Sequence, residues 1–161
     1  MISLLIAKII SMLGLTGYLF VAVFNNWRDK GTNRFLLNQM FGMELLKSDL
    51  VLGRGLLNRA IDTSSFATNV LKAVVLVQAV LVVLLLLGSI ELLMVLFAGG
   101  SSSTAVATCN IAVSCFMALW FFFWCGGLWF GYWIKTGQIQ EVHMKLIILS
   151  ILELIFLNCA N

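Results

Sequence analysis

Four long apolar stretches alternate with polar segments along the chain. They cover residues 2–24, 70–98, 105–134 and 139–157. A helix needs about 20 predominantly apolar residues to cross the hydrocarbon core of a bilayer. The pattern therefore predicts an all-α membrane protein with one domain over residues 1–161. Its four transmembrane helices are expected to form an antiparallel bundle.

Residues 25–69 form the only long polar connection, and it remains rich in leucine, phenylalanine and methionine. Asn33 is expected to cap a short helix within it. That helix would carry four apolar residues on one stripe, namely Leu36, Met40, Met43 and Leu46. We expect an amphipathic segment between the first two spans, which lies on the membrane surface or covers one end of the bundle.

Short polar clusters mark the ends of the predicted spans. The hydroxyls of Thr63, Ser64 and Ser65 are expected to cap the second span, and residues 99–104 to form a tight turn that caps the third. Gly137 is expected to end the third helix.

Composition supports the membrane class. Of the 161 residues, 61% are hydrophobic and 11% are charged, whereas soluble domains are about half apolar and about a quarter charged. This excludes an ordinary soluble enzyme, a disordered chain and a nucleic-acid-binding domain, in spite of a net charge of +3. The first apolar stretch has no basic region before it, so we interpret it as a retained transmembrane helix.

The candidate chemistry is sparse. The single histidine, His143, is expected to be solvated or to cap the last helix. The four cysteines are expected to be buried free thiols, and they lack the spacing of a metal site. No phosphate-binding loop, nucleophile elbow or paired-carboxylate motif is present. The sequence predicts no enzyme activity, cofactor or metal, although a bound phospholipid is compatible with it.

Three ionisable residues fall inside the predicted spans: Lys8, Glu91 and Glu153. All three lie roughly 6 to 11 Å below one surface, at a helical rise of about 1.5 Å per residue. Charges at this depth usually turn inward and find partners. We expect Lys8 to contact Glu91 or Glu153, as a clamp between helices or as part of a proton or ion relay, unless Lys8 extends to the surface. Gln78 and Asn110 are expected to form hydrogen bonds between helices.

Small and aromatic residues indicate faces for packing. Small residues recur on one face of the first span at Ala7, Ser11, Gly14 and Gly17, and the third span contains a glycine pair, Gly127 and Gly131. Such faces let helices approach closely in a membrane. An interfacial aromatic belt is expected at Trp129, Tyr132 and Trp133.

Four crossings would place both termini on one side of the membrane, here named side A. The 25–69 connection and the turn before the last span would lie on the opposite side, side B. All lysines and arginines except Lys8 belong to side B, so the positive-inside rule would make side B cytoplasmic or matrix-facing.

The chain resembles a bacterial family of small integral membrane proteins, the domain of unknown function 2165 family. The resemblance covers nearly the whole chain, and its motif residues are Asn26, Asp29, Asn33, Met43-Glu44, Arg59-Ala60-Ile61, Gly126-Gly127-Leu128-Trp129-Phe130, Trp133 and Gly137-Gln138. It implies four transmembrane helices, no established catalytic activity and cytoplasmic termini, contrary to the charge count. Family members carry carboxylates where this chain has Gln78 and Leu128.

These features favour a non-catalytic accessory or structural subunit of a larger assembly. Its partners would be membrane lipids and other membrane-protein subunits, not nucleic acid. A bacterial or mitochondrial inner membrane is the expected location, and a respiratory-chain complex the first candidate assembly. The alternative is a small transporter or an ion or proton channel that uses Lys8, Glu91 and Glu153.

Overall fold

The computed structural model describes residues 2–61 and 64–159, and all regular structure within them is helical. The elements, in chain order, are α1 (Ile2–Arg28), α2 (Lys30–Phe41), α3 (Glu44–Lys47), the 3-10 helix η1 (Arg54–Arg59), α4 (Ser64–Ala98), α5 (Ser102–Trp129) and α6 (Trp133–Asn158).

Three helices are long and apolar enough to cross a membrane, namely α1, α4 and α5, with mean hydropathies of 2.0, 2.9 and 1.9 over their most apolar windows. The fourth expected span also forms a helix, α6, but it is not among these three. Every stretch of 18 residues within α6 contains three charged side chains, so α6 is less apolar than the other long helices. These charges are Lys135, Glu141, Lys145 and Glu153.

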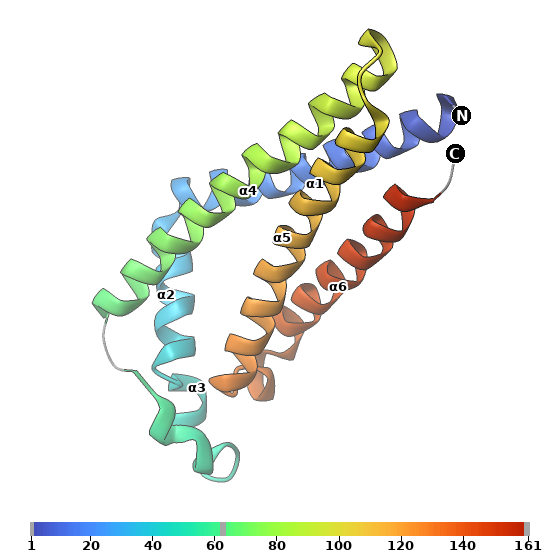
Figure 1. Cartoon of the computed structure of the whole chain (residues 1–161). Helices are drawn as coiled ribbons and strands as arrows, with labels where there is room; N and C mark the ends of the chain where they lie inside the picture. Colours follow the sequence, from blue (N-terminus) through green and yellow to red (C-terminus); the bar gives the residue numbers. More distant parts are fainter. Residues whose placement is uncertain (1, 62–63, 160–161) are drawn as a thin grey trace.

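The long helices form a row in which each packs on the next along the chain, α1 on α4, α4 on α5 and α5 on α6. Figure 1 shows the start of α1, the α4–α5 turn and the end of α6 at one end of the molecule, which corresponds to side A. The connection with α2, α3 and η1 lies at the other end with the α5–α6 turn, and α1 crosses obliquely behind α4.

Local backbone chemistry moves several predicted boundaries. The third helix ends at Trp129, and not at residue 134, because Gly131 adopts a left-handed conformation with φ +63°. The break therefore falls at Gly131 instead of Gly137, and α6 begins at Trp133 with a kink at Thr136. Ser101 caps α5 by accepting from the Thr104 N–H, as predicted. The second helix begins at Ser64, and the predicted cap Thr63 lies outside the described residues.

The polar connection folds into short helices that pack against the side-B end of the bundle. The cap of its first helix is Asp29, whose side chain accepts from the Thr32 N–H, so the prediction that Asn33 caps it is wrong. Phe41, at the end of α2, lies between the rings of Phe66 and Phe130, with centroid distances of 4.9 and 5.0 Å. These edge-to-face ring contacts join α2 to α4 and to the α5–α6 turn.

The long helices bury small and polar groups together with the core and leave large apolar side chains outside. Met12, Leu85 and Phe116 are fully buried, and so are Ser89 and Ser150. Large apolar residues remain exposed on all four helices, including Phe20, Leu76, Phe122 and Ile155. Only Cys109 of the four cysteines is buried, while Cys115, Cys125 and Cys159 are exposed, which corrects the expectation of buried thiols. Such an apolar outer surface suits lipid.

Candidate functional site

Buried polar side chains gather at the side-A end, where the start of α1 meets the end of α6. Lys8 and Glu153 are only 3% and 4% exposed. The Ser11 hydroxyl donates to Oε2 of Glu153, and the Lys8 ammonium donates to the backbone carbonyl of Cys159 over 3.1 Å. Two hydrogen bonds therefore connect helices that lie more than 140 residues apart in sequence.

The Lys8 bond gives this buried cation a capping role. Cys159 is the C-cap residue of α6, so its carbonyl belongs to the group that lacks a partner within the helix. A positive charge at this position also interacts favourably with the negative end of the helix dipole. Lys8 thus satisfies a polar group that would be costly in lipid.

The expectation that Lys8 pairs with Glu91 or Glu153 is corrected by this geometry. No ion pair between Lys8 and either carboxylate occurs in the described part of the chain. Lys8 and Ser11 share one face of α1 because they are three residues apart. The shorter Ser11 side chain binds the carboxylate, while the longer lysine reaches the helix end. Sequence reasoning assigned Ser11 to packing alone and missed this hydrogen bond.

Glu91 and Cys109 belong to the same end of the bundle. Glu91 lies near the end of α4, and the fully buried Cys109 lies near the start of α5. Oε2 of Glu91 and Oε1 of Glu153 are buried and have no hydrogen-bond partner among the described residues. We name Lys8, Ser11, Glu91, Cys109 and Glu153 the side-A cluster.

The two neutral polar residues predicted to bond between helices do so. Asn110 of α5 and Asn158 of α6 exchange reciprocal amide hydrogen bonds of 3.1 and 2.9 Å. Gln78 of α4 accepts from Asn26 over 2.9 Å, and Asn33 of α2 donates to Asn26 over 2.8 Å. The amides of Asn26, Asn33 and Gln78 therefore connect α1, α2 and α4 in one network.

The motif residue Asp29 sits between α1 and α2, at their junction. Hydrogen bonds from the backbone N–H and the side chain of Thr32 hold the pKa of Asp29 below its ordinary value. Asp29 thus caps α2, while Asn33 and Asn26 bond across the junction of α1 and α2, so the run has a structural role.

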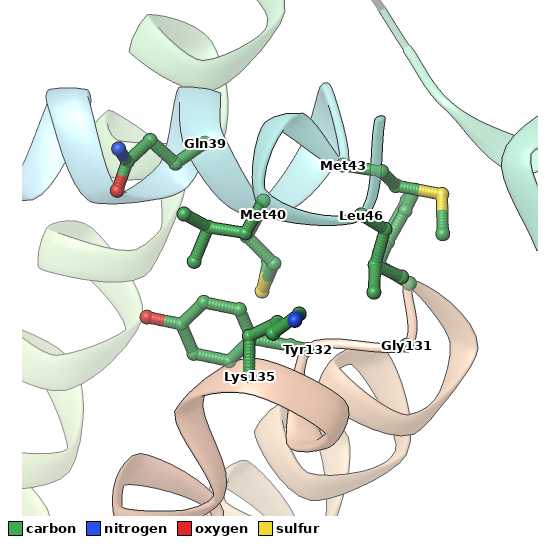
Figure 2. A pocket seen from close by; sticks show the side chains of 9 residues that line it. Gln39, Met40, Met43, Leu46, Gly131, Tyr132 and Lys135 are labelled. Atoms are coloured by element: carbon green, nitrogen blue, oxygen red, sulfur yellow. The ribbon is translucent and has the colours of Figure 1, made fainter. Parts of the chain in front are cut away.

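At side B, the α2–α3 segment packs against the α5–α6 turn. Figure 2 shows Met40 facing Tyr132 and Lys135 across this junction, with Leu46 above Gly131. The gap between them has a volume of about 10 Å³, which is about one water site and too small for a larger ligand. The junction is therefore a packing contact.

Two polar contacts hold the side-B junction. Lys135 forms an ion pair with Asp49, and its hydrogen bond, together with the N–H groups of Leu52 and Val51, holds the pKa of Asp49 well below its usual range. The Arg59 guanidinium lies over the Trp129 ring, 4.4 Å from its centroid, and donates to the Trp129 carbonyl over 3.1 Å.

The predicted small-residue faces behave differently in the two helices. Gly127 is buried, and a Cβ built on it would overlap the side-chain amide of Gln140, so α5 and α6 approach closely there. Gly131 lies in the turn and not on a shared helix face. On α1, Ala7 and Ser11 are half-buried, whereas Gly14 and Gly17 are exposed, and a Cβ added to either glycine would meet no atom within 4 Å.

The aromatic residues also separate into two groups. Trp129 and Trp133 are 57% and 51% exposed at the side-B end, where an interfacial belt would lie, while Tyr132 faces the α2–α3 segment (Figure 2). His143 is half-buried and stacks on Trp120, with ring centroids 5.7 Å apart. The prediction of a solvated or capping histidine is therefore wrong, since residues far apart in sequence enclose the ring.

No group of three or more histidine, cysteine, aspartate or glutamate side chains within residues 2–61 and 64–159 is arranged to hold a metal ion. Residues 4–160 match a family, DUF2165, described as predicted small integral membrane proteins. No curated protein and no solved structure matches the chain.

Proposed function

The chain belongs to the DUF2165 family of predicted small integral membrane proteins, and within that membrane setting we propose that it is a non-catalytic accessory subunit of a larger inner-membrane complex. In this proposal the outer faces of the helices bind partner helices and lipids. The polar groups inside serve to hold the helices in register.

The proposal includes four crossings, with α6 as the fourth. Its 26 residues span about 39 Å at the helical rise, enough for the hydrocarbon core. The inner face of α6 carries the buried Gln140, Ser150 and Glu153, whereas the outer face carries the exposed Ile148 and Ile155. The exposed Glu141 and Lys145 form an ion pair nearer the side-B end of α6, so the part of the helix from Leu146 onward is the part that suits lipid outside and polar partners inside.

The observation that carries the docking role is the uncovered small-residue face of α1. Gly14 and Gly17 leave open space between exposed bulky neighbours, Ile10, Leu13 and Val21. In a membrane, small residues bring two helices close enough for dispersion contacts and weak hydrogen bonds. Within the described part of this chain nothing fills that space, so we infer that a helix of another subunit does.

The test fills this face. The double variant Gly14→Leu and Gly17→Leu has room for its side chains and gains helix propensity, so the fold should persist. After extraction in mild detergent, the wild-type chain is expected to migrate on native gels with a larger complex, and the double variant to migrate alone. Gly126→Leu is the control, because Gly126 on α5 also has open space around it.

Mass spectrometry of the co-purified proteins would identify the assembly, with respiratory-chain complexes as the first candidates. A wild-type chain that migrates alone, or only with copies of itself, would contradict the accessory role. So would a complex that survives the double variant unchanged.

A second candidate is a proton or ion pathway through the side-A cluster, as predicted for Lys8, Glu91 and Glu153. The observation that favours it is the nearly complete burial of Glu153 with Oε1 unpartnered among the described residues, since buried acids in membranes often mark such pathways. Flux into vesicles that is abolished by Glu91→Gln and Glu153→Gln, with native-gel migration unchanged, would favour this function over the accessory role.

A further inference from the structure

A long apolar groove separates α4 from α5 in the side-B half of the molecule. Its volume is about 770 Å³, and it is partly open to the surroundings of the protein. Valine, leucine, alanine and phenylalanine side chains line it together with one thiol, and six representative residues are Val70, Val77, Leu84, Cys115, Ala118 and Phe122. In Figure 1, α4 and α5 diverge from their shared turn toward side B, where this groove lies.

The groove ends near the middle of the two helices. On α4 it extends from Val70 to Leu84, about 21 Å along the axis. Beyond Leu84 the helices close on each other, because a Cβ on Gly88 would lie only 3.0 Å from Sγ and 3.3 Å from Cα of Cys109. The groove is thus open toward side B and blocked toward side A.

The length of the groove indicates which kind of molecule can fill it. A partner helix that crosses the bilayer needs the full hydrocarbon thickness of about 30 Å, and the Gly88–Cys109 contact would exclude its second half from the groove. A fatty-acyl chain enters from one surface and ends near the midplane, about 15 Å below the edge of the hydrocarbon core. The apolar lining and the blocked end therefore match the acyl chains of one leaflet.

The side-B end of the groove is positively charged. Lys72 is exposed and lies one turn before the lining residue Leu76 on the same face of α4, at the rim of the groove. Arg59 covers Trp129, which lies two turns after the lining residue Phe122 on the same face of α5. Neither Lys72 nor Arg59 forms an ion pair with a carboxylate in the described part of the chain. A phosphate group at the mouth of the groove would complement these charges.

We propose that the α4–α5 groove binds an anionic phospholipid of the side-B leaflet, with its acyl chains between the helices and its phosphate near Lys72 and Arg59. The site requires only that α4 and α5 lie in the bilayer, and it does not depend on the accessory role proposed above.

Native mass spectrometry of the purified chain tests the site after reconstitution in nanodiscs. Two lipids with the same acyl chains are compared, phosphatidylglycerol and phosphatidylcholine. We expect a retained lipid, with phosphatidylglycerol preferred about fivefold for each cation that contributes. Lys72→Gln should reduce this preference about fivefold. It should weaken the retention of phosphatidylcholine less, because that headgroup carries no net charge. Lys72 is chosen because Arg59 also holds Trp129.

The groove itself is tested by Ala118→Phe, which fills it, against Ala107→Phe, the same change at an exposed position outside its lining on α5. Ala118→Phe should lose the retained lipid and Ala107→Phe should keep it, with equal helical content by circular dichroism. A phospholipid with a photoreactive group at the end of its acyl chain should crosslink near Cys115, at the deep end of the groove. Equal retention in both variants, no headgroup preference, or crosslinking of a protein segment instead of lipid would overturn the proposal.

Discussion

At the scale of single residues, the position of Glu153 shows how a carboxyl group is accommodated inside the helices. The group is 4% exposed, and the Ser11 hydroxyl is its hydrogen-bond donor in the described structure. A buried polar group that loses its partner suffers the full desolvation penalty. Ser11 is therefore the residue on which the link between α1 and α6 depends.

We expect Ser11→Ala to destabilise the protein by about 1–3 kcal/mol, because it leaves Oε2 of Glu153 without its donor. This exceeds the mean of about 0.6 kcal/mol for hydrogen bonds between transmembrane helices. Unfolding of the purified chain by SDS titration in detergent measures the change. Ser114→Ala, at an exposed serine of α5, is the matched control, and equal losses in the two variants would show that the Ser11 bond contributes nothing special.

At the scale of elements, α5 and α6 are held together by close contact at one glycine and by amide pairing at the other end. Gly127 brings the backbone of α5 next to the side chain of Gln140, while Asn110 and Asn158 bond reciprocally near side A. The two contacts lie far apart along the helices, so together they define the angle between them.

Gly127→Ala should cost about 1–3 kcal/mol, since the new methyl group overlaps the Gln140 amide and overpacks the contact. Gly126→Ala has open space and should instead gain up to about 1 kcal/mol of helix propensity. The same SDS titration compares the two variants. Adding Gln140→Ala to Gly127→Ala should recover most of the loss, and a purely additive double variant would argue against this contact.

At the scale of the whole molecule, the arrangement of ends predicts the topology. The α4–α5 turn and the end of α6 lie at side A, and the α2–η1 connection lies at side B (Figure 1). If α6 crosses the bilayer, these two groups face opposite compartments.

Labelling with a membrane-impermeant maleimide in sealed vesicles tests this topology. The native Cys159 and an added Ser102→Cys should react from the same side, and Leu50→Cys, at an exposed loop residue, from the other. In each variant every native cysteine other than the one under test is first replaced by alanine or serine, so that each position is read alone. A Cys159 that reacts together with Leu50→Cys would mean that α6 does not cross. The side from which Cys159 reacts also decides between two orientations. The charge count makes side B cytoplasmic or matrix-facing, whereas the family resemblance makes the termini cytoplasmic.

Much of this protein follows from its sequence because the local signals are strong. Runs of apolar residues specify α1, α4 and α5, since lipid allows little except a helix with all its backbone groups bonded. The Ser101 cap also follows from residue type. So does the fact that Gln78 and Asn110 each bond to another helix, because a polar side chain in a span needs a partner on a neighbouring helix. The family resemblance, confirmed over residues 4–160, rests on the same local patterns.

Only the tertiary structure decided which partner each polar residue takes. Lys8 reaches the Cys159 carbonyl and Ser11 reaches Glu153, because the crossing of α1 and α6 sets distances that spacing along one helix does not encode. His143 stacks on Trp120 for the same reason. The exposed face of Gly14 and Gly17 and the groove between α4 and α5 likewise depend on how far apart the helices lie. Sequence determines which segments enter the membrane, and packing between segments distant in the chain determines which of their faces remain free to bind.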